Sequence, residues 1–471
     1  MTHTPTKPAP PEGTGRPGTG APEPEGRRRA WRETSDRVRG AATTEPGRLR
    51  IIGAALALLA VAFGGVTAWQ ITERSTAADN VLHHSGPLSS DAADIYRLLA
   101  DADATVTGGF LVGGEEPQSV ADRYRKDIDQ ASTLITQAAA NSRGATDAAA
   151  LTSLSTQLPY YTQLVATAQA DNRQGFPLGG AYLRYANEQM RKDNGLLSAA
   201  NTLYRAETAR LNHDYARSRA LPWAAWALGA VALAALVWAQ RRHYLRTNRV
   251  FNRGMMAASG AAAVALVWLL TAHLVARGDL GDSYAHGAKS LQVLNNARIA
   301  VLQARGDENL TLVTRGSGDS YDASFAKGMN GLAGTDPKGV GGELAQALAL
   351  ADTNAGRTPV NAAVKSVQIW RQRHAAERAS DNKGDYATAV AEVIGGKDAG
   401  GATVTQTTGQ CFDRVDQDLE QAVHQEQTEF RSAADSGHGA LSLLPFGAGL
   451  LAVLAAAGAL LGIGRRLSEY R

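Results

Sequence analysis

The chain contains 471 residues, carries a formal net charge of +3 and has one cysteine, Cys411. This length allows roughly three domains, and one cysteine excludes an intrachain disulfide. The mean hydropathy is slightly negative, which would be typical of a soluble protein if the apolar residues were spread evenly along the chain.

The apolar residues are instead concentrated in four blocks that contain no Asp, Glu, Lys or Arg. The blocks cover residues 51–70, 221–239, 255–276 and 441–464. Each can cross a hydrocarbon core of about 30 Å, which takes about 20 helical residues. Buried helices of soluble proteins rarely run this far without a charge, so we predict four transmembrane helices. A cleaved signal peptide is the alternative for the first block, although its apolar stretch exceeds the usual h-region.

Basic residues flank these blocks on one side of the membrane. The stretches 1–50, 240–254 and 465–471 together hold 18 basic and 7 acidic residues, a net charge of +11. The rest of the chain therefore carries 3 minus 11, or −8. By the positive-inside rule the three stretches face the cytoplasm, which predicts a multi-pass protein of the cell membrane with both termini inside. The stretch 1–50 is rich in Pro, Gly and Arg and predicts a disordered basic tail.

The two long segments between the spans, 71–220 and 277–440, both have helical patterns. Apolar residues recur at three- and four-residue spacing, as at Ile95, Leu98 and Ala102. The expected helices cover 91–112, 119–141, 147–172 and 179–219 in the first segment, and 287–314, 342–354, 359–380 and 403–434 in the second. The fold class that follows is an all-α membrane protein whose four spans carry two extracytoplasmic four-helix-bundle-like domains.

Three local similarities between the halves indicate a tandem duplication. The stretch 166–175 resembles 376–384, with Asp-Asn followed by a basic residue in both. Pro222-Trp223 corresponds to Pro445-Phe446 at the outer entrance of each returning span. A weaker similarity relates the stretch around Asp103 to the stretch around Asp307.

The repeated Asp-Asn-basic motifs are candidate contacts for a ligand or a docking protein. The residues are Asp171, Asn172, Arg173, Asp381, Asn382 and Lys383. A structural role is the alternative, and we favour it, because Asn and Gly commonly close helices in the left-handed conformation.

The prolines at the returning spans are candidate relay hinges. Pro222 and Pro445 should each start a new helix or kink a continuous one, and simple interfacial anchoring by the aromatic neighbours is the alternative. The connector between the second and third spans offers a cytoplasmic basic face for a partner. This face comprises Arg241, Arg242, Arg246, Arg249 and Arg253.

The chain contains no enzyme signature. Walker, dinucleotide-binding, kinase, Gly-x-Ser-x-Gly and His-Glu-x-x-His motifs are all missing from the sequence. His83-His84 has no third metal ligand at a suitable spacing. We therefore expect no catalytic residue, no cofactor, no metal and no nucleic-acid partner. The spans contain His273 as their one ionisable residue, which argues against transport.

Paired spans that enclose a helical bundle resemble the sensor modules of bacterial chemoreceptors and histidine kinases. The chain departs from both, because no HAMP linker, signalling tip or kinase domain follows the last span. The excess of arginine over lysine and the richness in Ala and Gly look like an actinobacterial protein. The whole layout resembles the GlnX-type membrane proteins of that group. This resemblance implies a relay from an extracytoplasmic glutamate- and aspartate-binding lipoprotein to a cytosolic serine/threonine kinase.

These observations favour a non-enzymatic transmembrane signal relay in the lipid bilayer. Its outer segments would sense a ligand or a solute-binding lipoprotein, with amino-acid status as one signal. Its cytoplasmic face would pass the state to a partner such as a serine/threonine kinase, and a homo-oligomer is compatible with this reading. The alternative is a structural or scaffolding protein of an envelope or secretion complex.

Overall fold

The computed structural model describes residues 45–114, 116–142, 144–174, 178–247, 252–336 and 340–467. The predicted disordered tail lies outside these residues except for its end, which already belongs to the first helix. Arg249 and the last residues of the chain, 468–471, lie outside them as well.

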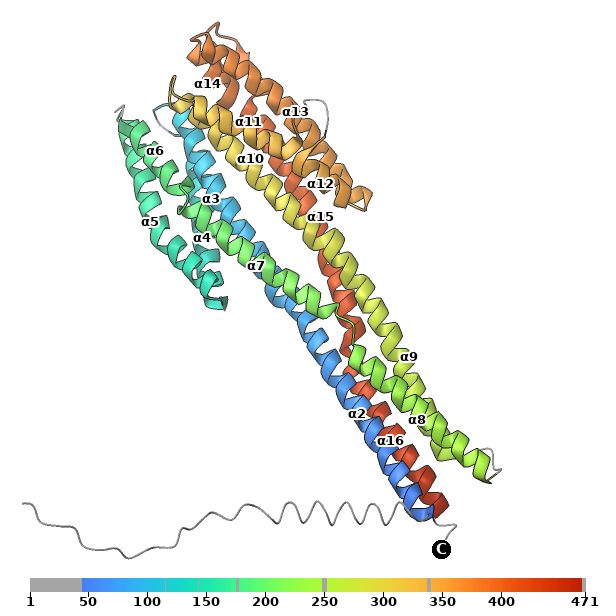
Figure 1. The fold of residues 1–471 in the computed structure, drawn as a ribbon. Helices are drawn as coiled ribbons and strands as arrows, with labels where there is room; N and C mark the ends of the chain where they lie inside the picture. The colour runs from blue at the N-terminus through green and yellow to red at the C-terminus, as the bar shows by residue number, and fades with distance from the viewer. Residues whose placement is uncertain are drawn as a thin grey trace, which may run out of the picture. The chain divides into compact units, whose positions relative to one another are not determined.

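The described part of the chain is helical apart from one short hairpin (Figure 1). The first half contains α2 (Glu45–Asn80), the π-helix η1 (Val81–Ser85), α3 (Gly86–Val112), α4 (Gln118–Asn141), α5 (Ala145–Arg173), α6 (Leu178–Arg191), α7 (Leu196–Ser218) and α8 (Trp223–Thr247). The second half contains α9 (Arg253–Asp282), the π-helix η2 (Ser283–Ala288), α10 (Lys289–Val313), α11 (Asp319–Ala333), α12 (Gly342–Leu350), α13 (Asn354–Asn382), α14 (Tyr386–Ile394), α15 (Thr408–Ser442) and α16 (Leu444–Leu467). The hairpin pairs β1 (Gly396–Lys397) antiparallel with β2 (Thr403–Val404).

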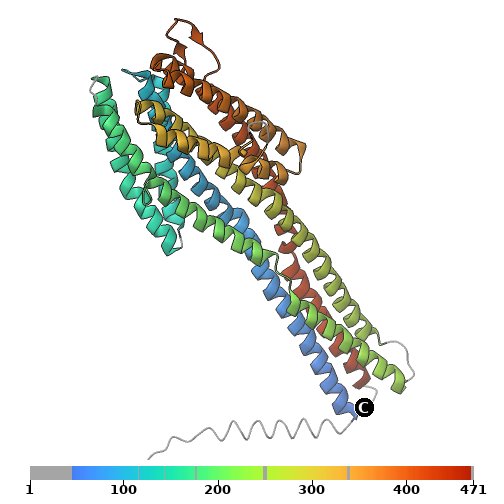
Figure 2. The ribbon, with the colours of Figure 1, turned by 45° about the horizontal axis from the view of Figure 1, so that its top comes forward.

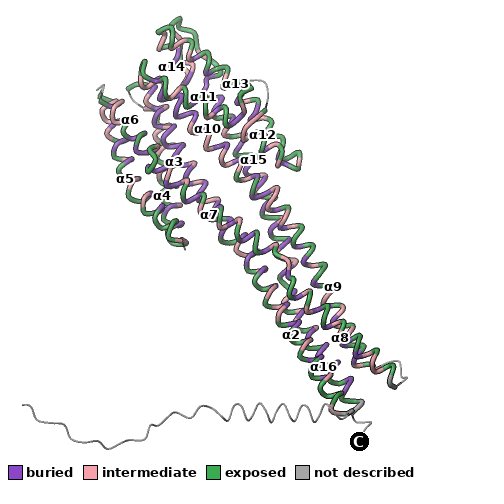
Figure 3. Tube along the Cα trace, viewed as in Figure 1, coloured by how far each residue is buried: buried purple, intermediate pink, exposed green. Residues whose placement is uncertain are grey.

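Four of the described helices are long and apolar enough to cross a membrane, and they contain the four predicted spans. Their outward faces carry large apolar side chains that are exposed in the protein itself, such as Leu58 in α2, Val267 in α9 and Leu454 in α16. Figure 3 shows exposed positions along α2, α8, α9 and α16. Contiguous apolar surface of this kind needs a partner, and lipid is the partner that the length of the helices fits. The predicted all-α membrane fold is confirmed.

The two halves repeat one order of elements. In each, a span helix continues through a π-helix into a long bundle helix, α3 or α10. Further helices follow, and α7 or α15 then returns to the second span of its half. This repeated order agrees with the tandem duplication that the sequence indicates.

The chain forms two compact units. One comprises the described residues of Met1–Ala62, Val231–Ala263 and Ala452–Arg471. Within it α9 and α16 approach closely, because Gly254 faces Gly462: a Cβ on Gly254 would lie 2.6 Å from the Cα of Gly462. The other unit comprises Phe63–Ala230 and Val264–Leu451 and contains both bundle segments.

The two bundle segments share one hydrophobic core rather than forming two separate bundles. α3 packs against α10, as the views in Figures 1 and 2 both show. Residues 98–104 of α3 and 304–312 of α10 are buried without interruption. When every residue over two helical turns is buried, all sides of the helix are covered. α3 and α10 are covered on all sides because each packs against helices of both halves.

Some helix boundaries differ from those expected. The helix expected at 179–219 is divided into α6 and α7 at Gly195, where a Cβ would come within 2.5 Å of the carbonyl oxygen of Gln189. The helix expected at 403–434 begins at Thr408, after a capping box formed by Thr407 and Gln410. α11 and α14 are additional helices that the sequence patterns did not indicate.

Candidate functional site: the membrane-proximal junction

A π-helix lies where each outgoing span helix enters the bundle. η1 (Val81–Ser85) joins α2 to α3, and η2 (Ser283–Ala288) joins α9 to α10. A π-helical turn contains more residues than an α-helical turn, is rare, and occurs frequently at functional sites. Its appearance at corresponding places in both halves makes this region a candidate site. We call it the membrane-proximal junction and define it by η1, η2 and the residues of α7 and α15 that contact them.

Phe430 of α15 packs against the glycines of both outgoing helices. A Cβ on Gly86, directly after η1, would lie 3.1 Å from Cζ of the Phe430 ring. A Cβ on Gly287, within η2, would lie 2.9 Å from the Cα of Phe430. Both distances are shorter than ordinary contacts, so the absence of side chains at these two glycines allows α15 to approach both π-helices.

Tyr215 of α7 ties the first half to η2. Its hydroxyl lies 2.6 Å from Oγ of Ser283, and Ser283 donates in turn to the carbonyl oxygen of Phe430 over 3.0 Å. Tyr215 is therefore the donor to Ser283. Burial raises the pKa of Tyr215, so this hydroxyl keeps its proton. The chain of two hydrogen bonds links α7, η2 and α15, which belong to different halves of the protein.

The returning helices are interrupted where the outgoing helices are continuous. α7 ends at Ser218 and α8 begins at Trp223, directly after Pro222. α15 ends at Ser442 and α16 begins at Leu444, with Pro445 in its first turn. Proline lacks a backbone N–H and is tolerated in the first turn of a helix. Both prolines therefore start new helices, which is one of the two geometries expected from the sequence.

The interruption before α8 is held by side chains of α2. Arg74 donates from Nε to the carbonyl oxygen of Ala220 over 2.6 Å and from Nη2 to that of Leu221 over 3.0 Å. Gln70 accepts a hydrogen bond from the backbone N–H of Ala225 over 3.1 Å. Backbone groups that the broken helix leaves without helical partners are thus satisfied by the outgoing helix of the same half.

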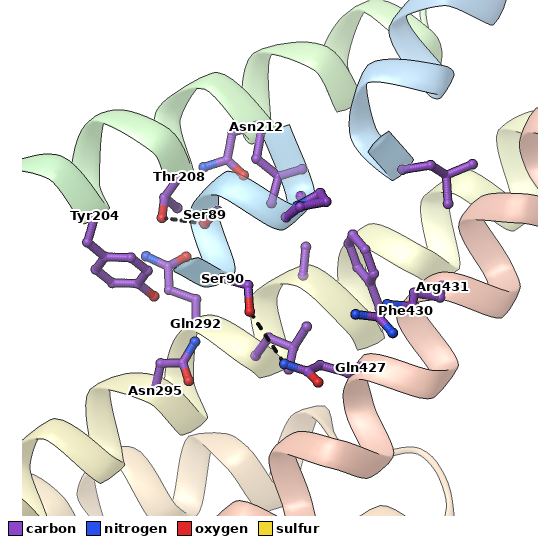
Figure 4. A pocket seen from close by; sticks show the side chains of 16 residues that line it. Ser89, Ser90, Tyr204, Thr208, Asn212, Gln292, Asn295, Gln427, Phe430 and Arg431 are labelled. Atoms are coloured by element: carbon purple, nitrogen blue, oxygen red, sulfur yellow. Dashed lines mark hydrogen bonds between the residues drawn. The ribbon is translucent and has the colours of Figure 1, made fainter. Parts of the chain in front are cut away.

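A small cavity of about 70 Å³ adjoins the junction between α3, α7, α10 and α15 (Figure 4). Gly86 and Phe430 line it, so the cavity touches the residues that hold the π-helices. Its polar walls include Ser89, which bonds Thr208 over 3.1 Å, and Gln427 of α15. A cavity needs about 10–15 Å³ to hold one water, so this cavity has room for a few waters or one small polar molecule.

A half-buried arginine joins the halves nearer the outer end of the bundle. Arg191 of α6 contacts Asp103 of α3, with 3.2 Å between Nε and Oδ2, and also pairs with Asp307 of α10. Burial alone would lower the pKa of Arg191, but the two carboxylates outweigh it and the pKa is raised. A Cβ on Gly306 would collide with the guanidinium. The weak sequence similarity between the regions of Asp103 and Asp307 therefore marks two aspartates that share one partner.

A second charged cluster surrounds His374 of α13. Its Nδ1 lies 3.1 Å from Oε1 of Glu308, and its Nε2 lies 3.0 Å from Oδ1 of Asp322. Trp370 donates to the same Glu308 oxygen over 2.9 Å. Burial opposes a charged ring, but these carboxylates raise the pKa of His374 to about 9. The imidazolium is therefore the form that the bundle holds at neutral pH.

The repeated Asp-Asn-basic motifs occupy corresponding helix ends. Residues 171–173 finish α5, whereas 381–382 finish α13 and Lys383 follows as its cap. Gly384 has a φ of 81°, as a left-handed helix end requires, which supports a capping role for the second motif. Gly175 of the first motif lies outside the described residues.

The second motif also borders a surface pocket of about 380 Å³. Asp381 and Asn382 line this pocket together with Arg315 and Arg378, and Arg378 pairs with Asp381 over 2.6 Å. A ligand or partner role for these residues stays a prediction.

The arginines of the connector lie at the ends of α8 and α9. Arg241, Arg242 and Arg246 belong to the last part of α8, and Arg253 begins α9. Arg249 lies outside the described residues. Gln240 ties the two helices by donating to the carbonyl oxygen of Met255 and to Oγ of Ser259, each over 2.9 Å. Arg241, Arg242 and Arg253 therefore lie within two residues of this contact between two spans.

The π-helices and the roles of Phe430 and Arg191 are not evident from the sequence alone. Gly86 and Gly287 were the available signals, since Gly86 follows the first predicted span by 16 residues and Gly287 follows the third by 11. Their role depends on the ring of Phe430, more than a hundred residues away along the chain, and only the tertiary structure brings that ring to them.

Comparison with known families adds one finding. A family model described as an actinobacterial sensor domain matches residues 77–216. The matched region extends from the end of α2 to the end of α7 and thus covers the first bundle segment. The comparison with curated proteins and the comparison with solved structures each gave no match. The family match and the four membrane-spanning helices fit a sensor protein of the membrane.

Proposed function

We propose that this protein is a non-enzymatic transmembrane signal relay. Its outer bundle senses an extracytoplasmic ligand or solute-binding lipoprotein, and the membrane-proximal junction passes the state to the spans. The observation that carries the proposal is the position of the sensor match. Residues 77–216 begin in the last turn of α2 and end beside the interruption before α8. Both ends of the matched segment therefore lead directly into helices that can cross a membrane.

We infer that the junction is an element that can adopt two arrangements. A π-turn bonds residues five apart and an α-turn bonds residues four apart, so conversion of one into the other would rotate the helix on one side relative to the other. The interruptions at Pro222 and Pro445 let α8 and α16 move without bending a continuous helix. Hydrogen bonds of Ser283 connect η2 to α7 and α15. A rotation or shift of one of these helices would therefore displace the other two. A signal would bias this equilibrium.

We further propose partners on both sides of the membrane. A solute-binding lipoprotein that reports amino-acid status would dock on the outer bundle. A serine/threonine kinase would contact the basic connector, where Arg241, Arg242 and Arg253 lie at helix ends beside the Gln240 contact. The resemblance to GlnX-type proteins and the positive charge of the connector support this assignment.

Movement of the spans tests the relay. In a Cys411→Ala background, spin labels at Leu245 in α8 and Leu461 in α16 report the distance distribution between these helices in nanodiscs. Gly287→Val, which displaces Phe430 from η2, should shift or broaden this distribution. Gly281→Val is the matched control, because a Cβ there has nothing within 4 Å. An unchanged distribution in Gly287→Val would contradict the relay and favour a fixed scaffold.

Co-purification tests the partners. Pull-down of the full-length protein from native membranes should recover a solute-binding lipoprotein and a soluble kinase. Replacing Arg241, Arg242 and Arg253 together by Gln should lose the kinase and retain the lipoprotein. Recovery of neither partner with intact protein would refute this part of the proposal and leave the relay to be judged by span movement.

A further inference from the structure

A larger cleft lies at the outer end of the bundle, away from the membrane-proximal junction. It has a volume of about 480 Å³ and is lined by residues of α3, α4, α10, α14 and α15. This size falls within the range of roughly 300–1,000 Å³ that is usual for small-molecule sites. We call it the outer cleft. Because its walls come from both halves, any molecule bound there contacts both sides of the shared core.

One side of the outer cleft suits a carboxylate. Arg305 of α10 is only 8% exposed, and its Nη1 makes hydrogen bonds to Glu308 over 2.6 Å and to Oγ1 of Thr408 over 3.1 Å. Nη2 has no hydrogen bond to a described residue and lies beside Gly409, where a Cβ would come within 2.9 Å of it. A guanidinium N–H that is still free is a strong donor to a carboxylate oxygen.

The first turn of α15 adds a second feature that favours a negative group. Thr407, Gly409 and Gln410 line the cleft, so the N-terminus of this 35-residue helix faces it. The side chain of Thr407 caps the N–H of Gln410, and Gly409 has no side chain to cover the backbone between them. Free N–H groups and the helix dipole at such an end attract anions.

An independent observation indicates what else the ligand must carry. Asn309 of α10 lines the cleft and is completely buried. Its Nδ2 donates to the carbonyl oxygen of Ala104 over 3.1 Å, which fixes the orientation of the amide. Its Oδ1 has no hydrogen-bond partner within the described part of the chain. A buried acceptor normally has a donor, so the missing group is an N–H or O–H.

The charges around the outer cleft limit the ligand further. Its lining residues include two arginines, Arg123 and Arg305, and two aspartates, Asp101 and Asp413. Arg123 and Asp101 neutralise each other, with 2.7 Å between Nη2 and Oδ1. A balanced lining does not suit a polyphosphate or another polyanion. It suits a molecule with one carboxylate and a neutral or positive donor nearby.

We propose that the outer cleft binds a small carboxylate that carries an adjacent hydrogen-bond donor, a 2-amino or 2-hydroxy acid. The carboxylate pairs with Nη2 of Arg305 and the first turn of α15, and the donor bonds Oδ1 of Asn309. This assignment deepens the proposed sensing function by naming a ligand class and rests on it for its biological meaning. Ligand binding is measured directly, so a failure to bind would refute this assignment without refuting the relay. The relay is tested separately by the distance between the spans.

Titration calorimetry of the full-length protein in nanodiscs tests the site. The probes are glycine, glutamate, lactate and malate, with acetate and methylamine as molecules that each lack one of the two required groups. At least one amino or hydroxy acid should bind, and acetate should bind at least about tenfold more weakly, because the bond to Asn309 is lost. Comparison of the amino acids (glycine and glutamate) with the hydroxy acids (lactate and malate) shows whether the donor that the site prefers is an amino or a hydroxyl group.

Two variants and one control locate the binding. Thr105→Phe fills the cleft from a half-buried position of α3 and should abolish binding. Thr136→Phe on the exposed face of α4 is the matched control and should retain it. Arg305→Lys should weaken binding by about tenfold through loss of the planar donor pair, and Thr105→Phe decides the matter if Arg305→Lys does not fold. Absence of binding by every probe, or binding that survives Thr105→Phe, would overturn the proposal. If no probe binds and the protein instead captures another protein, and Thr105→Phe blocks this capture, the ligand proposal is overturned and the cleft is a docking surface.

Discussion

His374 and Glu377 are buried one turn apart on α13 and both bind their protons more tightly in the folded protein. The carboxylates of Asp322 and Glu308 raise the pKa of His374 to about 9. Burial raises the pKa of Glu377 to about 8. Each raised pKa contributes stability that is complete below the unfolded value and is lost as the pH rises through the folded value. The stability that both groups contribute to the bundle is therefore lost as the pH rises.

The melting temperature of the full-length protein in detergent should consequently fall as the pH is raised from 7 to 9.5. One pKa unit corresponds to about 1.4 kcal/mol, so a loss of roughly 2–4 kcal/mol and several degrees is expected. Glu377→Gln should flatten the part of this decline below pH 8, because it removes the carboxyl group. Glu420→Gln, on the exposed face of α15, is the control. A melting temperature that is constant up to pH 9.5 would contradict the assignment.

Arg191 should contribute strongly to stability because it is shared by two buried carboxylates. Arg191→Met leaves Asp103 and Asp307 without their cation, and breaking a buried pair costs about 3–5 kcal/mol. Adding Asp307→Asn should recover part of the loss, since it removes one unpaired charge. Arg184→Met, on the exposed side of the same helix, should change stability by less than about 0.5 kcal/mol. Equal melting temperatures for the two arginine variants would show that the buried network is not needed.

The sequence predicted part of this residue-level arrangement. The local similarity around Asp103 and Asp307 could be seen in the sequence, and both aspartates contact Arg191. Arg191 itself could not be found, because its position in α6 looks like that of any surface arginine until α10 is placed beside it. Asp381 and Asn382 lie at the helix end that their local pattern predicts, because capping depends on neighbours in sequence.

At the scale of elements, the interruptions of the returning helices were predictable and the π-helices were not. A missing N–H at Pro222 or Pro445 acts on the adjacent turn, so it can be inferred from the sequence alone. A π-turn has no comparable residue pattern in this chain. η2 is instead accompanied by tertiary contacts, those of Ser283 with Tyr215 and of Gly287 with Phe430.

Replacing a glycine by alanine should therefore lower the stability of the protein within η2 and raise it in α9, just before η2. Gly287→Ala places a Cβ 2.9 Å from Phe430, and overpacking of this kind costs about 1–3 kcal/mol. Gly281→Ala in α9 meets nothing within 4 Å and should stabilise by about 0.5–1 kcal/mol, because alanine favours the helix. Thermal unfolding of the two variants beside the parent protein measures the difference. Stabilisation by Gly287→Ala would mean that α15 does not pack closely against η2.

At the scale of the whole molecule, the orientation in the membrane is still a prediction from charge. In a Cys411→Ala background, a cysteine at Thr136 in α4 should react with an impermeant maleimide on intact cells. A cysteine at Tyr244 in α8 should react only after lysis, because the basic connector faces the cytoplasm by the positive-inside rule. Both positions are exposed in the protein, so the membrane alone distinguishes them. The reverse labelling pattern would invert the topology.

The four spans could be predicted because length and composition are local properties, whereas the shared core could not. Helical periodicity shows that α3 and α10 have apolar faces, but it does not say which helix covers each face. The sequence therefore suggested two separate bundles. The structure joins them through the uninterrupted buried runs 98–104 and 304–312. The sensor match at 77–216 accordingly covers only one side of a core that both halves complete.

Cutting the chain in the basic connector tests this interdependence. Fragments 1–249 and 250–471, expressed together, should assemble and co-purify, because α3 and α10 bury their outer turns against each other. Fragment 1–249 alone should be degraded or lose its cooperative melting, since the α10-facing side of α3 would be exposed to water. Arg191→Met in the first fragment should weaken assembly, while Arg184→Met should not. A fragment 1–249 that melts cooperatively on its own, at the temperature of the full chain, would show that each half folds independently. A signal sensed by one half could then reach the other only through the junction, not through the shared core.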